Sequence, residues 1–232
     1  EKLLEFFLEG ERLEKNQLAL NTFKNWEPDI VYEDNDLVAF NKPAGMLSVP
    51  GKLPVNDLYS IAMKLYPQAT GPMLLHRLDM ATSGVLLFKK NKETHKALQA
   101  AFAHGSVRKR YIALLEKTPK KNEGEISLPL CLNPYERPRQ MIEYTYGKPA
   151  ETLFKVLNIN EKGQARVAFY PKTGRTHQLR LHAAHAEGLG CAIVGDDLYG
   201  HPSDRLYLHA EAIRFIHPST GQLLTIEAPC PF

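Results

Sequence analysis

The segment HRLDMATSG, residues 76–84, places an arginine and a carboxylate between two apolar runs. Arg77 and Asp79 are two residues apart, so in an extended segment their side chains point to the same face. A neighbouring cation favours the ionised form of a carboxylate even where water is excluded, and a fixed, ionised carboxylate suits nucleophilic or base catalysis. The same spacing also fits an ion pair that only fixes a loop, and the spacing alone favours that structural role. Catalysis by Asp79 is therefore one of two hypotheses at this point.

A second segment, KTGRTHQLRLHAAH at residues 172–185, gathers cations at the start of an expected helix. Arg175 lies just before the helix and Arg180 lies on it, and together with free backbone N–H groups they would favour an anion there. The segment also contains three histidines, His177, His182 and His185. The glutamate of the HExxH zinc motif is missing, and a metal site would need a carboxylate from elsewhere in the chain, so we predict histidines that are structural or face a bound ligand rather than a metal site.

Residues 89–121 carry ten basic residues against two acidic ones. A segment with this charge balance suits a phosphate backbone, although a solvated basic face explains it equally well. Tyr111 lies inside it, on an expected strand whose alternation puts Lys109 on the same face and Arg108 and Arg110 on the other. A tyrosine on a strand is usually a core residue. The basic residues on both sides of Tyr111 favour the alternative that its ring stacks on a nucleic-acid base.

The composition narrows the classes of protein. With 232 residues, 44% hydrophobic residues and a net charge of +3, the chain fits one large domain or two small ones with a real core. The three scattered cysteines favour a reducing, cytoplasmic compartment. No apolar run approaches the roughly 18 residues of a membrane span, so no membrane contact is predicted. Neither nucleotide-loop pattern, GxxxxGKS/T or GxGxxG, is present, and Ser83 lacks the G-x-S-x-G elbow of serine hydrolases.

The expected elements alternate between short strands and a few helices. Residues 1–28 predict an amphipathic helical N-terminal extension, and residues 29–232 form the remaining domain. Strands outnumber helices and several are joined by hairpins, which predicts an α+β fold with a mixed, mostly antiparallel sheet and flanking helices. The expected elements are two strands within 29–43, a helix over 57–66 capped by Asn56, a buried strand over 84–88, a helix over 92–104, a strand over 110–116, a hairpin over 151–171, a helix over 177–188 capped by Thr176, and a hairpin over 206–229.

Five motifs occur in an order and spacing that resemble one family. They are NKPAGMLSVPG (41–51), HRLDMATSGV (76–85), KRYIA (109–113), GRTHQLRLH (174–182) and IVGDDLYG (193–200). Together they resemble the RluA family of pseudouridine synthases, over the chain from about residue 29 to its end. The resemblance implies the pseudouridine synthase fold and an isomerase that converts uridine to pseudouridine in structured RNA.

The resemblance also implies roles for four residues. Asp79 matches the catalytic aspartate, Tyr111 the aromatic that stacks on the target uracil, and Arg77 an arginine implicated in flipping the base. Arg180 matches the arginine that forms a salt bridge with the catalytic carboxylate. No cofactor and no metal are implied.

The implied partner is RNA, from the large ribosomal subunit or tRNA, acted on by a cytoplasmic monomer without membrane contact. The alternatives are a non-catalytic RNA-binding module, against which the intact HRLD motif and Tyr111 argue, and a metal hydrolase that uses the histidines.

Overall fold

The computed structural model describes residue 23, residues 26–51 and residues 56–232. The predicted amphipathic helix over residues 1–28 falls almost wholly outside these residues, so the division at residue 29 stays a prediction. In the part of the chain that the structure describes, no helix is both long enough and apolar enough to cross a membrane.

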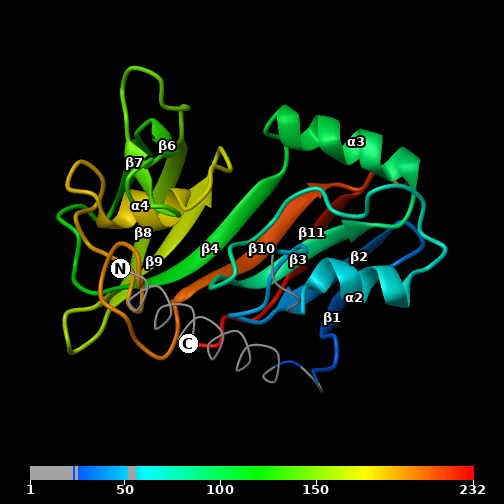
Figure 1. The fold of residues 1–232 in the computed structure, drawn as a ribbon, viewed down its shortest axis with the longest axis horizontal. Helices are drawn as coiled ribbons and strands as arrows, with labels where there is room; N and C mark the ends of the chain where they lie inside the picture. Colours follow the sequence, from blue (N-terminus) through cyan, green and yellow to red (C-terminus); the bar gives the residue numbers. More distant parts are fainter. Residues whose placement is uncertain (1–22, 24–25, 52–55) are drawn as a thin grey trace, which may run out of the picture.

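One long, mixed sheet forms the body of the protein (Figure 1). Its strands are β1 (Ile30–Glu33), β2 (Leu37–Lys42), β3 (Ser83–Lys89), β4 (Arg108–Leu115), β5 (Glu123–Ser127), β8 (Glu151–Ile159), β9 (Ala165–Pro171), β10 (Leu208–Ile216) and β11 (Leu223–Glu227). They run in the order β1-β2-β3-β10-β4-β9-β8-β5, with β11 paired to β10 beside this row. Among these pairs only β3 with β10 is parallel. The predicted α+β fold with a mostly antiparallel sheet is confirmed.

The helices and a small second sheet flank the two halves of the long sheet. Helices α2 (Leu58–Leu65) and α3 (Lys92–Ala103) lie against the half that contains β1, β2 and β3 (Figure 1). Helix α4 (Gln178–Ala184) and the hairpin of β6 (Leu130–Leu132) and β7 (Gln140–Ile142) lie over the half that contains β8 and β9. The short strands β5, β6 and β7 were not predicted from the sequence.

Strand β2 is buried on both faces, which explains its unbroken apolar run. Val38 and Phe40 belong to an apolar cluster with α2, on one side of the sheet. Leu37 and Ala39 point to the opposite side, where they share a second cluster with Leu98 of α3. Side chains alternate along a strand, so a strand between two helices must be apolar at every position.

Both predicted helix caps are wrong by one residue. Helix α2 is capped by Asp57 rather than Asn56, and the Asp57 carboxylate accepts a hydrogen bond from the backbone N–H of Ser60 at 2.8 Å. Helix α4 begins after His177 rather than Thr176, and His177 has a left-handed backbone conformation with φ of 53°. Asn56 and Asp57 are adjacent polar residues that both suit a helix cap, whereas the side chain of His177 makes no capping hydrogen bond at all.

Gly84, the last residue of the HRLDMATSG segment, allows β3 and β10 to approach each other. It pairs with Ala210 in the parallel register. Its φ is +113°, and a Cβ there would lie 2.2 Å from the carbonyl oxygen of Ala210. Any side chain would therefore push apart the two strands at the centre of the sheet.

The first prediction concerns this glycine. Gly84→Ala is expected to lower the free energy of unfolding by about 3 kcal/mol or more, because an unfavourable φ and a backbone clash add. The measurement is the urea midpoint. The matched control is Gly163→Ala, which also has a positive φ (+76°) but has nothing within 4 Å of the added carbon. Equal losses in the two variants would show that the approach of β10 does not require the glycine.

Candidate active site

The segment before β3 directs alternate side chains into the core and into a cavity. His76 points inward: its Nε2 accepts a hydrogen bond from the backbone N–H of Leu87 at 3.2 Å, and its ring stacks on Phe102. Burial, followed by the charge of Lys109, lowers the pKa of His76 to about 3, so the ring is neutral. Leu78 is buried as well.

Arg77 and Asp79 alternate with these two residues and line the same cavity. Leu78, between them, also lines this cavity. Among the described residues, Arg77 and Asp79 form no ion pair with each other. The guanidinium of Arg77 instead donates to the Thr176 hydroxyl at 3.5 Å.

Lys42, the lysine of the NKPAG motif, ties two loops together beneath Asp79. It is fully buried, and its Nζ donates to the carbonyl oxygens of Pro43 (2.9 Å), Met46 (2.8 Å) and Met80 (3.1 Å). Burial lowers the pKa of Lys42 to about 7, against the attraction of the Asp79 carboxylate. The lysine thus fixes the loop after β2 against the residue that follows Asp79.

A cavity of about 90 Å³ brings the four predicted site residues together. Arg77, Asp79, Tyr111 and Arg180 all line it, although they come from a loop, from β4 and from α4. An adjoining hollow of about 400 Å³ shares three of them, which are Arg77, Asp79 and Arg180. A partly exposed carboxylate therefore lies beside an aromatic ring and two guanidinium groups.

Tyr111 lies on β4 at the junction of the two halves of the protein. Its ring is partly buried and packs against the apolar clusters on both sides. Burial, then the negative charge of Asp79, raises the pKa of Tyr111, so its phenol is neutral. Lys109 shares its cavity face, whereas Arg110 pairs with Glu211 at 2.7 Å, which agrees with the predicted alternation.

Arg180 pairs with Asp196 rather than with Asp79. Its Nε and one terminal nitrogen contact the two Asp196 oxygens at 2.9 and 2.5 Å, and the same nitrogen contacts Asp197 at 2.9 Å. Burial opposes the charge of Arg180, but the hydrogen bonds that Arg180 donates to Asp196, together with the nearby carboxylate charges, outweigh it and raise the pKa. No ion pair within 4.0 Å joins Arg180 to Asp79 among the described residues, so the predicted direct salt bridge is wrong.

The reason for this pairing lies in the loop that follows Ile193. Asp196 is fully buried, and its carboxylate also accepts the backbone N–H groups of Leu198 and Tyr199, each at 3.0 Å. A buried carboxylate held in this way presents both oxygens to a guanidinium as a bidentate partner. Asp196 therefore holds Arg180 at the edge of the cavity, from where its charge still acts on Asp79.

Sequence reasoning assigned no role in the site to Asp196 or Tyr199, and it named His177 only as one of three histidines that are structural or face a bound ligand. The His177 Nδ1 lies 3.0 Å from the Tyr199 hydroxyl, and this hydroxyl accepts the backbone N–H of Gln140 at 2.6 Å. Burial lowers the pKa of His177. The sequence analysis used IVGDDLYG only as one of five family motifs, and its two adjacent acids, downstream of the cationic GRTHQLR motif, were the signal available.

The remaining histidines of the 172–185 segment do not gather as ligands in the described part of the chain. His182 is buried, and its Nδ1 lies 3.0 Å from the Thr152 hydroxyl. Burial lowers the pKa of His182 to about 4. A neutral, hydrogen-bonded core histidine is the structural role that the sequence favoured.

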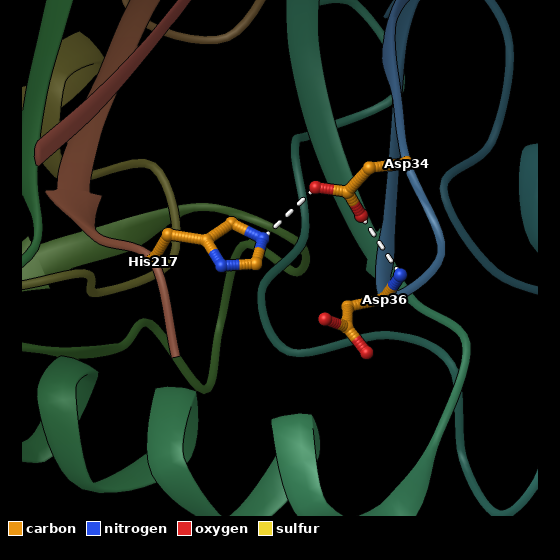
Figure 2. A group of neighbouring side chains, drawn as sticks. All are labelled: Asp34, Asp36 and His217. Atoms are coloured by element: carbon orange, nitrogen blue, oxygen red, sulfur yellow. Dashed lines mark hydrogen bonds and ion pairs between the residues drawn. The ribbon is translucent and has the colours of Figure 1, made fainter. Parts of the chain in front are cut away.

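Asp34, Asp36 and His217 form the one metal-like group of three that the described residues contain (Figure 2). The His217 Nε2 lies 2.9 Å from an Asp34 oxygen, and its Nδ1 accepts from the backbone N–H groups of Ser219 and Thr220. With Nδ1 accepting, Nε2 carries the proton and donates to Asp34. These donors and acceptors are already used, so the group is a clamp between the turn after β10 and the turn between β1 and β2.

Part of the basic charge of residues 89–121 is used inside the protein. Lys90 pairs with Glu33 at 2.7 Å, and the buried Lys89 donates to the Thr70 carbonyl oxygen at 3.1 Å. Arg110 is paired as described above. Fewer of the ten cations are available to phosphates than the sequence indicates.

Comparisons with known proteins identify the family. A family model described as RNA pseudouridylate synthase matches residues 36–185. The dual-specificity RNA pseudouridine synthase RluA of Vibrio cholerae is 41% identical over 209 residues, which cover 88% of this chain and 83% of the relative. RluA of Escherichia coli K12 is 39% identical over 210 residues, covering 88% and 93%.

Solved structures give the same result. Human RNA Pseudouridylate Synthase Domain Containing 1 superposes with a TM-score of 0.74 at 29% identity, over 89% of this chain and 84% of that chain. Human RNA Pseudouridylate Synthase Domain Containing 4, at 24% identity, has a TM-score of 0.69 over 95% and 94%, and supports the fold. The phrases SVPGK, YPQA, NPYERPRQ and GKPAET in the sequence favour RluA itself within the family, and the curated relatives agree. The chain therefore belongs to the RNA pseudouridylate synthase family, in its RluA group, and is an isomerase that acts on RNA.

Proposed function

We propose that Asp79 is the nucleophile of this isomerase and that the target uridine enters the cavity which Asp79 lines. The observation that carries the proposal is the convergence of Arg77, Asp79, Tyr111 and Arg180 on one cavity. The catalytic domain that we propose comprises residues 29–232.

The chemistry needs little besides a carboxylate. Conversion of uridine to pseudouridine breaks the N1–C1′ bond, turns the base and joins C5 to C1′. The C5 hydrogen leaves as a proton and N1 gains one, so atoms and electrons balance without an oxidant or reductant. Asp79 attacks either C1′ of the ribose or C6 of the uracil, and then leaves again when the new bond is complete.

The neighbouring residues bind and orient the base. The target must leave its stack, at a cost of a few kcal/mol, and Arg77 at the exposed mouth of the cavity would occupy the space it leaves. Stacking on Tyr111 would return roughly 1–3 kcal/mol. Arg180, held by Asp196, would supply positive charge beside Asp79 and the substrate phosphate.

The proposed targets are stem-loop uridines in both large-subunit rRNA and tRNA. The support is that the curated relatives are named dual-specificity RNA pseudouridine synthases. We propose that the protein acts on them as a monomer in the cytoplasm.

Release of tritium from RNA labelled at uridine C5 tests the activity. The protein should release label from a tRNA or rRNA stem-loop with EDTA present, because the reaction needs no metal. RNA binding without release would support the non-catalytic module instead. Release that EDTA abolishes, together with strand cleavage, would support a metal hydrolase.

The role of Tyr111 gives a further prediction. Tyr111→Ala is expected to weaken RNA binding by roughly 5- to 150-fold, the equivalent of about 1–3 kcal/mol of base stacking. Tyr111→Phe, the matched control, keeps the ring and should keep most of the affinity. Filter binding with a stem-loop RNA measures both. If the two variants lose equal affinity, the hydroxyl rather than the ring holds the base.

A further inference from the structure

The segment around β6 and β7 exposes three tyrosines within a short stretch of chain. Tyr135, Tyr144 and Tyr146 are 93%, 65% and 68% exposed. Burying a tyrosine ring is favourable, so a group of exposed rings is more typical of a binding surface than of a surface without a partner. Tyr144 is already engaged, since its hydroxyl bonds to Glu187, whereas the other two rings have no such bond among the described residues.

Tyr146 lines a cleft of about 590 Å³ between this segment and the start of α4. Figure 1 shows β6 and β7 beside α4, which carries Arg180. The same cleft is lined by Arg77, which also lines the cavity of Asp79. The cleft therefore adjoins the catalytic cavity, with which it shares Arg77, Gly174 and Arg175.

The charged side chains that line the cleft are all cations, although Glu143 lies close enough to Tyr146 to raise the pKa of its phenol. The lining contains three cations, Arg77, Lys148 and Arg175, and no carboxylate. None of the three forms an ion pair within the residues that the structure describes. Arg175 is held in place by a hydrogen bond from its Nε to the Pro149 carbonyl oxygen at 3.0 Å. Unpaired cations beside an exposed aromatic ring match a strand that has both phosphates and open base faces.

We propose that this cleft binds the nucleotides next to the target uridine, with a base stacked on Tyr146 and phosphates held by Lys148 and Arg175. The inference rests on the proposed function, because a uridine drawn into the Asp79 cavity leaves its neighbours unstacked. Their exposed faces need a partner, and Tyr146 is an exposed ring in the lining of the adjoining cleft. Tyr135, at the tip between β6 and β7, extends the same surface outward.

The test compares the steady-state constants of tritium release on a stem-loop RNA. Tyr146→Ala should raise KM roughly 5- to 150-fold and leave kcat within about twofold, because stacking outside the reacting base contributes to binding alone. Tyr146→Phe should restore the wild-type KM. Lys148→Gln should weaken binding and reduce the slope of log Kd against log salt by about one.

The matched control is Tyr170→Ala, an exposed tyrosine on β9 that lies outside the cleft and should leave KM unchanged. Urea midpoints equal to wild type would show that the variants fold. If Tyr146→Ala leaves KM unchanged while the wild type releases tritium, the cleft serves another partner, such as a protein, and the inference is wrong although the enzyme assignment stands. A fall in kcat at unchanged KM would also overturn it. No release by the wild type would instead overturn the proposed function.

Discussion

Asp79→Asn is expected to lower the rate of tritium release from C5-labelled RNA by roughly 10³-fold or more, as happens when other enzymes lose their nucleophile. Asparagine has the same shape but cannot form the covalent bond to C1′ or C6. The substitution should leave the fold intact, because the Asp79 side chain is only partly buried and makes no hydrogen bond within the described residues. Its backbone carbonyl, which accepts the N–H of Thr82 at 3.0 Å, is unchanged.

A measurement of RNA binding shows whether Asp79→Asn has lost only the chemical step or the binding site as well. The Asp79→Asn protein should bind the stem-loop RNA with an affinity close to that of the wild type, since Tyr111 and the arginines remain. Asp204→Asn, an exposed carboxylate away from the cavity, is the matched control and should release tritium normally. Release by Asp79→Asn at the wild-type rate would remove Asp79 from the mechanism.

The second large effect concerns the buried pair of Arg180 and Asp196. Arg180→Met is expected to cost about 3–5 kcal/mol of unfolding free energy, because it leaves the fully buried Asp196 carboxylate without its partner. Activity should fall as well, because the charge beside the cavity is lost. Urea unfolding and tritium release measure the two effects separately.

The double variant Arg180→Met/Asp196→Asn distinguishes the observed pair from the one implied by the family resemblance. The introduced amide oxygen can still accept the backbone N–H groups of Leu198 and Tyr199, while the unpaired buried charge is removed, so this variant should recover much of the lost stability while activity stays low. If Asp79 were the main partner of Arg180, removing the charge of Asp196 would relieve nothing, and the double variant would be no more stable than Arg180→Met alone. That outcome would contradict the pairing seen in the structure.

Much of the fold follows from local patterns in the chain. The alternation along 110–116, the apolar run at 84–88 and the turn residues of the two long hairpins predicted β4, β3, β8–β9 and β10–β11. Strands β6 and β7 were missed because each has only three residues, and β5 was missed because it is short and its partner β8 lies well downstream in the chain. The helix caps failed by one residue, since Asn56 and Asp57 are chemically similar and only packing distinguishes them.

For the site, too, local patterns predicted some features and not others. Side-chain alternation is a property of a few neighbouring residues, so HRLD alone placed Arg77 and Asp79 on one face and RKRY placed Lys109 with Tyr111. The motifs in order were enough to indicate the family and the residues that converge.

The sequence could not predict which carboxylate Arg180 binds. Asp79 and Asp196 both lie near it, and the choice depends on burial and on the backbone N–H groups of Leu198 and Tyr199, which hold Asp196 in place. Ion pairs between distant segments depend on which acid the folded chain desolvates and orients, and residue order does not contain that information.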